Sequence, residues 1–146
     1  MALLVSAVIP SYNSLKTIEK CLRSIAEGAY KNIEIIVVDD FSTDDSPNLV
    51  RQTELDYPLK LLRQPENCGP ACARNAGAKV ARGDYIFFFD SDTEMFPHTI
   101  ELGMREMERL EADAITGIYH LDALNPGFVP EYKALFNHIF FSSKGI

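Results

Sequence analysis

The sequence predicts an α/β protein with a doubly wound, mostly parallel sheet and helices on both faces. Two observations support this fold class. Short apolar runs alternate with helical patterns along the chain, and residues 85–89 are apolar at every position. A strand that is apolar throughout is typical of a central strand in a parallel sheet covered on both faces. The 146 residues, 47% of them hydrophobic and 24% charged, are enough for one such domain with a core.

The first half of the chain predicts two strands and two helices. An apolar run over residues 3–9 reads as a strand that Pro10 ends. Apolar residues then recur at helical spacing as far as Gly28, a natural C-terminal cap. A second strand is expected over residues 33–38, and the capping-box pattern from Ser42 to Asp45 predicts that a helix starts there.

The second half continues the alternation. A weaker strand is expected over residues 59–62, followed by an Ala-rich helix over residues 70–82. Small residues in that helix, among them Gly77, suggest that it lies close against the sheet. The apolar strand at 85–89 comes next, Pro97 opens another helix, and residues 112–117 predict a fifth strand.

Polar clusters follow three of the predicted strands. In open parallel sheets, ligands bind beyond the carboxyl ends of the strands. We therefore expect the three clusters to converge on one rim, and their members are Ser11, Tyr12 and Asn13, then Asp39 and Asp40, then Asp90, Ser91 and Asp92.

The third cluster has the chemistry of a metal site. Asp90 and Asp92 can approach one hard cation, and Mg²⁺ or Mn²⁺ prefers oxygen ligands shared with substrate phosphates. Such an ion would stabilise a departing diphosphate as a Lewis acid. The alternative is a capped loop, with Asp92 at the start of a helix.

Other candidates also have two interpretations. Asp39 or Asp40 either caps the turn after its strand or accepts a hydrogen bond from a nucleotide base. Tyr12 either belongs to a plain turn or stacks its ring on that base. Arg74 either binds a phosphate, which its fork geometry suits, or pairs with the nearby acids.

Charge and composition narrow the classes of partner. A formal net charge of −7 argues against a nucleic-acid partner and repels phosphates, so a phosphate site needs a local cation. The three cysteines form no metal pattern with the histidines and are expected to be free thiols. No run reaches the roughly 20 apolar residues of a membrane span. We expect a cytoplasmic protein, with the inner face of the membrane as the alternative for the full-length protein.

Taken together, the motifs closely resemble family 2 glycosyltransferases over about residues 4–96. The resemblance implies the GT-A fold, a nucleotide-sugar donor and Mn²⁺ or Mg²⁺. It implies that Pro10, Tyr12 and Asp40 hold the base, with Asp39 beside it. It also implies that Asp92 is the chief metal ligand, with Asp90 at the ribose or in the metal shell. Arg74 would lie near the pyrophosphate or brace the acids. The remaining expected contacts to the nucleotide sugar are Asn13, Asn67, Gly69 and Ser91.

The implied activity is metal-dependent, inverting transfer of a sugar from a nucleoside diphosphate, UDP being expected, to an unknown saccharide, lipid or protein glycan. Phe41 departs from the family pattern, which commonly has Gly or Asn there. No motif for a catalytic base follows Asp92. We therefore expect residues 1–146 to be a single nucleotide-sugar-binding domain that ends before the acceptor-binding half. The alternative is a donor-binding fragment without catalytic activity.

Two other classes fit the sequence less well. A nucleotidyltransferase needs a Gly-rich, basic phosphate loop after the first strand, and a phosphate-relay receiver needs an acceptor Asp after the third strand and a Lys after the fifth.

Near the C-terminus an apolar stripe predicts an interface. A homodimer, the missing half or the sheet itself would cover it, and its members are Leu135, Phe136, Ile139, Phe140 and Phe141.

Overall fold

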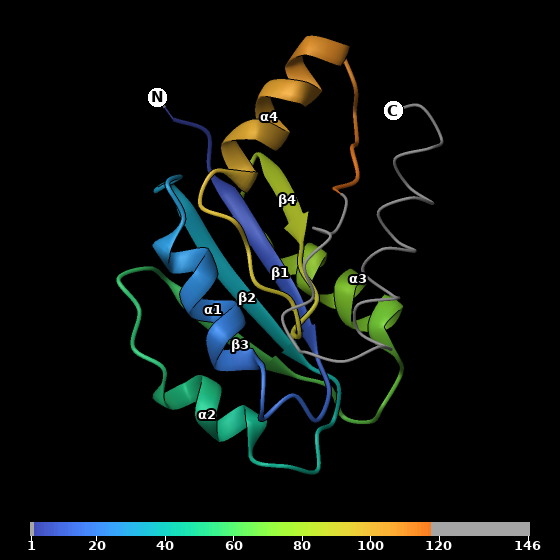
Figure 1. The fold of residues 1–146 in the computed structure, drawn as a ribbon. Coiled ribbons are helices and arrows are strands. Elements are labelled where there is room, and N and C mark those ends of the chain that lie inside the picture. Colours follow the sequence, from blue (N-terminus) through green and yellow to red (C-terminus); the bar gives the residue numbers. More distant parts are fainter. Residues whose placement is uncertain (1, 118–146) are drawn as a thin grey trace, which may run out of the picture. The chain divides into compact units, whose positions relative to one another are not determined.

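The computed structural model describes residues 2–117 and contains a four-stranded parallel sheet. The strands are β1 (Val5–Ser11), β2 (Ile33–Asp39), β3 (Leu59–Arg63) and β4 (Tyr85–Phe88), in the order β3-β2-β1-β4. Figure 1 shows them side by side, with β1, the first strand of the chain, in the interior of the sheet between β2 and β4. Every residue of β1 and β2 is buried, as expected for strands covered on both faces. The apolar run at 85–89, which was expected to be a central strand of this kind, instead forms the edge strand β4, in which Ile86 is 39% and Phe88 50% exposed. The predicted fold class is confirmed.

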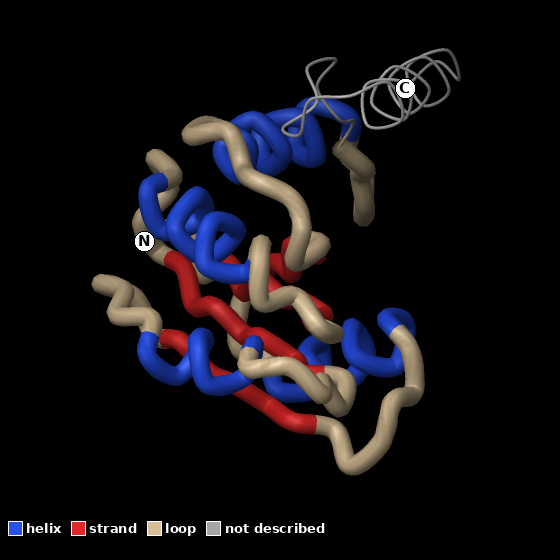
Figure 2. The backbone as a smooth tube through the Cα atoms, turned by 60° about the horizontal axis from the view of Figure 1, so that its bottom comes forward, coloured by secondary structure: helices blue, strands red, loops and turns tan. Residues whose placement is uncertain are grey.

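Helices cover both faces of this sheet (Figure 2). On one face, α3 (Pro70–Val80) packs on β1 and β2, where Val8, Ile36 and Val38 meet Ala73. Alternate strand residues point to the opposite face, which is the side of α1 (Ile18–Glu27) and its buried stripe. The short helix α2 (Ser46–Gln52) contacts both α1 and β3.

Gly77 allows α3 to approach the sheet closely. A Cβ atom at this position would lie 2.4 Å from Cγ1 of Val8 and 3.1 Å from Cγ2 of Val38. The small residue predicted from the sequence is therefore required by packing and not by backbone conformation.

A buried polar network holds the connection between α3 and β4. Glu34 accepts hydrogen bonds from the Ser6 hydroxyl at 2.7 Å and from the backbone N–H of Arg82 at 2.7 Å, and it pairs with the Arg82 guanidinium. Gly83 N–H donates to the Ser6 hydroxyl at 2.8 Å. Desolvation opposes ionisation of Glu34, but these hydrogen bonds and the positive charge hold its pKa below the ordinary value.

The first strand does not end at Pro10, as the sequence predicted, but at Ser11. Pro10 stays in register with Val38 of β2. The carbonyl of Val8 accepts from Phe89 N, so the even positions of β1 face β4, which ends at Phe88. Because no strand lies beside Pro10 on that side, its missing N–H donor costs no ladder hydrogen bond.

Three other local predictions differ from the structure. The helix after β2 begins at Ser46, and Asp44 rather than Ser42 accepts from its first N–H, because the Ser42 hydroxyl is engaged by Asn13 N–H. Residues 112–117, predicted as a fifth strand, form no strand. The helix expected from Pro97 is α4 (Thr99–Leu110), which begins two residues later.

Contacts divide the chain into two compact units, Met1–Leu102 and Gly103–Ile146. The sheet and all the candidate residues described below lie in the first unit. The apolar stripe near the C-terminus lies outside the described residues. Among residues 2–117, no helix is long and apolar enough to cross a membrane.

Candidate functional site

A cavity of about 400 Å³ opens at the carboxyl ends of β1, β2 and β4. The registers Ser11↔Asp39 and Val8↔Phe88 bring these three strand ends together. The polar clusters that follow the strands therefore meet around one space, as the sequence predicted. The lining residues are Pro10, Ser11, Tyr12, Asn13, Ser14, Thr17, Asp40, Asn67, Gly69, Pro70, Asp90, Ser91 and Asp92.

Tyr12 provides a large apolar surface at the cavity. Tyr12 lines the space and is 49% exposed, so part of its surface is accessible to a ligand. Pro10 lies two residues earlier on the same wall. A flat ring beside polar groups suits a nucleotide base, which needs stacking on its face and hydrogen bonds at its edge.

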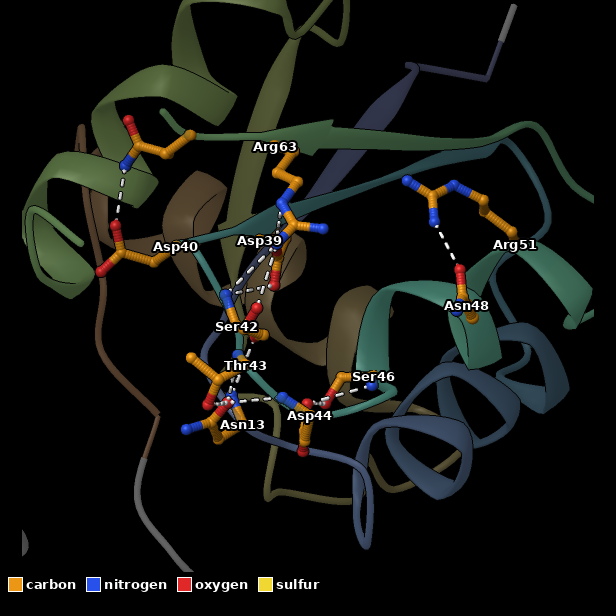
Figure 3. A network of polar contacts seen from close by, with 11 residues as sticks. Asn13, Asp39, Asp40, Ser42, Thr43, Asp44, Ser46, Asn48, Arg51 and Arg63 are labelled. Atoms are coloured by element: carbon orange, nitrogen blue, oxygen red, sulfur yellow. Dashed lines mark hydrogen bonds and ion pairs between the residues drawn. The ribbon is translucent and has the colours of Figure 1, made fainter. Parts of the chain in front are cut away.

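Asn13 joins the loop after β1 to the loop after β2 (Figure 3). Its backbone lies in the left-handed region with φ of 49°, which Asn tolerates well. Its side-chain oxygen accepts from Thr43 N at 2.8 Å and Asp44 N at 3.2 Å, and its own N–H donates to the Ser42 hydroxyl at 2.9 Å. The side-chain carbonyl is thus committed to the fold, although Asn13 also lines the cavity.

Asp39 is buried beneath the site and does not line the cavity. Both of its carboxylate oxygens accept from Ser42 N at 3.3 Å, and Oδ2 lies 3.4 Å from Nε of Arg63. Phe41, which lies between Asp39 and Ser42 in the sequence, has φ of 65°. Its ring packs under the Arg63 guanidinium. Asp39 therefore closes the turn after β2, which is the capping interpretation left open for one member of the Asp pair.

Asp40 reaches the cavity and also holds its far wall. Its Oδ1 accepts from Cys68 N at 2.9 Å and from Nε2 of Gln64 at 3.2 Å, and its Oδ2 accepts from Gly69 N at 2.7 Å. Gly69, with φ of 86°, precedes the first turn of α3. The carboxylate thus fixes the loop that brings Asn67 and Gly69 to the cavity. Sequence reasoning missed Gln64, because nothing in its surroundings distinguishes it from a surface residue.

We call residues 89–98, between β4 and α4, the acidic loop. It carries Asp90, Ser91 and Asp92 into the cavity. Arg74 from α3 donates to Oδ1 of Asp90 at 2.6 Å, and Arg74 does not line the cavity. Of the two interpretations given for Arg74, pairing with an acid is the arrangement seen, and it places one positive charge beside the carboxylates.

Asp92 is an exposed carboxylate of the acidic loop and lines the cavity. Within residues 2–117 its side chain makes no hydrogen bond or ion pair. The described residues contain no cluster of three or more His, Cys, Asp or Glu side chains suited to a metal ion. Two carboxylates are nevertheless the donor set expected for Mg²⁺ or Mn²⁺ when substrate phosphates supply the other ligands. The residues present therefore fit a metal that is held jointly with a ligand.

A buried thiol lies behind the acidic loop. Burial raises the pKa of Cys21 to about 12, and the negative charges of Asp92, Asp90 and Glu94 add to this rise. The thiol stays protonated and contacts the Asp90 carbonyl at 3.6 Å. Near this loop an anionic ligand would meet three carboxylates, so a cation is needed to bind it there.

Comparisons with known proteins agree with this arrangement. The model of glycosyl transferase family 2 matches residues 6–144. The chain is 37% identical over 121 residues to the glycosyltransferase GlyG of Streptococcus pneumoniae serotype 4, and the match covers 82% of this chain and 40% of GlyG. The chain thus spans less than half the length of that relative.

Solved structures show the same fold. TarS of S. aureus, residues 1–349 in complex with UDP, is 29% identical with a TM-score of 0.73, over 86% of this chain and 38% of TarS. The mannosyltransferase PcManGT of Pyrobaculum calidifontis, in complex with GDP-Man and Mn²⁺, is 30% identical with a TM-score of 0.68. That match covers 82% of this chain and 35% of PcManGT. The sheet described above is therefore the sheet of GT-A glycosyltransferases.

Proposed function

The chain belongs to glycosyl transferase family 2, and from this premise we propose that it is a metal-dependent, inverting glycosyltransferase whose cavity binds a UDP-linked sugar. The sugar would pass to a saccharide, lipid or protein glycan. One observation carries the proposal. The cavity has an exposed aromatic ring, Tyr12, on the wall after β1, and the carboxylates Asp90 and Asp92 on the wall after β4. A nucleoside diphosphate has the matching parts, a flat base and a charged diphosphate.

The base lies on Tyr12 in this proposal. Stacking on the ring removes one face of the base from water, and Asp40 offers its remaining acceptor capacity to a base N–H. Asp40 already accepts three hydrogen bonds from the protein, so its carboxylate is held rigidly where the base edge arrives. A uracil N–H is a suitable donor to such a carboxylate. The bound UDP of TarS supports the choice of base.

The diphosphate lies at the acidic loop. Asp92, with Asp90 beside it, would hold Mn²⁺ or Mg²⁺ jointly with the phosphate oxygens, and the metal when bound supplies Lewis-acid stabilisation of the leaving diphosphate. Arg74 neutralises part of the charge of Asp90, which limits the repulsion between the loop and the incoming phosphates. The Mn²⁺ complex of PcManGT supports a divalent ion.

A second function, donor binding without transfer, is favoured by one observation. Inverting transfer needs a base that takes the proton of the acceptor hydroxyl. Among the described residues, the carboxylates that line the cavity are Asp40, Asp90 and Asp92, and each already has a role toward the donor. The proposed transfer activity therefore requires a base from outside residues 2–117.

Titration calorimetry with UDP and GDP, each with Mn²⁺ and with a chelator, tests the proposal. We expect UDP to bind more tightly than GDP, and Mn²⁺ to strengthen binding of UDP. Asp92→Ala should reduce the affinity with Mn²⁺ to the metal-free value, while Asp56→Ala, a matched change at an exposed site away from the cavity, should leave it unchanged. Absence of binding to either nucleotide with Mn²⁺ would refute the donor site.

Turnover separates the two functions. Release of UDP from UDP-sugars by this chain, with water or a saccharide as acceptor, would support transfer. Donor binding without any UDP release would support the second function.

A further inference from the structure

Three hydrogen bonds join the acidic loop to helix α1 and to Ala29, which follows its C-cap. The Cys21 thiol donates to the Asp90 carbonyl at 3.6 Å, Met95 N–H donates to the Ser24 hydroxyl at 2.9 Å, and Ala29 N–H donates to the Pro97 carbonyl at 2.7 Å. The three contacts therefore occur in the same order along the helix segment and along the loop. The loop lies along α1 rather than crossing it at a single point.

Side-chain spacing on α1 suits this arrangement. Cys21 and Ser24 are three residues apart and share one face of the helix, and the C-cap Gly28 follows four residues after Ser24. Gly28 makes room for the buried side chain of Met95, because a Cβ there would lie 2.5 Å from the Met95 methyl. The helix and its C-cap therefore present a thiol, a hydroxyl and a gap to the same loop.

The Ser24 hydroxyl has a fixed orientation. It donates to the Cys21 carbonyl at 2.8 Å, and its lone pairs are thereby turned toward Met95 N–H. The two anchor points, Asp90 and Met95, enclose Asp92, whose own side chain has no hydrogen bond within residues 2–117. The position of the Asp92 carboxylate thus depends on the backbone that α1 holds at either side.

We propose that Ser24 and Cys21 are positioning residues for the acidic loop, which they hold in the shape that lets Asp90 and Asp92 share a divalent cation with the donor's diphosphate. The inference rests on the proposed function. It assigns to α1 a task beyond packing on the sheet, since neither Ser24 nor Cys21 lines the cavity. Groups that orient metal ligands typically change metal affinity about 10- to 100-fold when they are removed.

Three variants test this role. Ser24→Ala removes the acceptor of Met95 N–H, Ser24→Thr keeps a hydroxyl, and Thr53→Val is the control. The Thr53 hydroxyl also bonds a helix carbonyl, that of Leu49 at 2.8 Å, but it lies at the end of α2 and away from the cavity. The affinity for UDP is measured by calorimetry with Mn²⁺ and with a chelator.

Ser24→Ala should weaken UDP binding about tenfold with Mn²⁺, at the lower end of the range for such groups, and leave metal-free binding unchanged. Ser24→Thr should retain most of the native enhancement by Mn²⁺, and Thr53→Val all of it. An equal loss with and without metal would indicate a general structural effect and overturn the inference. So would an unchanged enhancement in Ser24→Ala.

Hydrogen exchange without any ligand separates this inference from the proposed function. In Ser24→Ala the Met95 amide should exchange at least about tenfold faster than in the native chain, because its hydrogen-bond acceptor is gone. An unchanged rate would overturn the positioning role even if UDP binds as proposed. Faster exchange in a chain whose native form shows no Mn²⁺ effect would instead refute the metal site and leave the loop anchored as described.

Discussion

Replacing Asp40 with Asn should destabilise the protein markedly, although only one oxygen becomes an amide nitrogen. Asp40 is 3% exposed and accepts three hydrogen bonds. Asn keeps one acceptor, which can serve Gln64 Nε2 and Cys68 N. Its NH₂ group then faces Gly69 N–H, at the present distance of 2.7 Å, so that two donors oppose each other.

The loss can be estimated from these contacts. A hydrogen bond to a charged group contributes about 1.5–3 kcal/mol, and a donor left without an acceptor costs about 1–3 kcal/mol. Losing the Gly69 bond and the charge on the other two gives about 2–4 kcal/mol in the free energy of unfolding. Domains have about 5–15 kcal/mol in total, so the variant should fold but with much reduced stability.

Urea denaturation followed by far-UV circular dichroism measures this loss, since the chain has no tryptophan to report by fluorescence. Asp56→Asn is the matched control, because Asp56 is exposed, and it should change stability by less than about 0.5 kcal/mol. A loss in Asp40→Asn no larger than the control's would refute the idea that Asp40 clamps the loop before α3.

Three other changes test the fold around the site. Gly77→Ala should lower stability by up to roughly 2 kcal/mol in urea denaturation, because overpacking against Val8 costs about 1–3 kcal/mol and the better helix propensity of Ala offsets only about 1 kcal/mol of this cost; a gain would contradict the close packing. Phe41→Asn should raise stability by roughly 0.5–1 kcal/mol, because the left-handed backbone costs a bulky residue about 1–2 kcal/mol and the lost ring contact with Arg63 about 0.5–1; lower stability would show that the ring matters more than the strain. The pKa of Glu34 is lowered in the folded state, so its contribution is fully present above the ordinary value of 4.5 and is lost as the pH falls through the folded pKa. The stability difference between the native chain and Glu34→Gln should therefore shrink as the pH falls below 4.5, and a constant difference would contradict the ionised network.

The strand and helix pattern was predictable because it depends on residues near in sequence. The apolar runs at β1, β2 and β4 marked the sheet, and the polar residues after them marked its carboxyl edge. The rule that parallel strands end at a common edge then brought Tyr12, Asp40 and Asp92 to one cavity. Phe41, where the family commonly has Gly or Asn, has the positive φ that favours those residues.

What the sequence could not reveal depends on contacts between distant residues. Asp39 closes the turn after β2 while Asp40 holds the loop before α3, and this difference follows from the positions of their partners Arg63, Gln64 and Gly69. The continuation of β1 through Pro10 depends on the neighbouring strand, because β4 ends at Phe88 and leaves no partner beside Pro10 on that side. The part of α1 that faces the acidic loop is, in sequence, an ordinary amphipathic helix.

The most direct test of the central claim is a crystal structure of this chain with UDP and Mn²⁺, in which the anomalous signal of manganese locates the ion. We predict the base on the Tyr12 ring and the manganese peak between the diphosphate and the Asp92 carboxylate. A nucleotide outside the cavity, or a manganese ion that does not touch the acidic loop, would contradict the account.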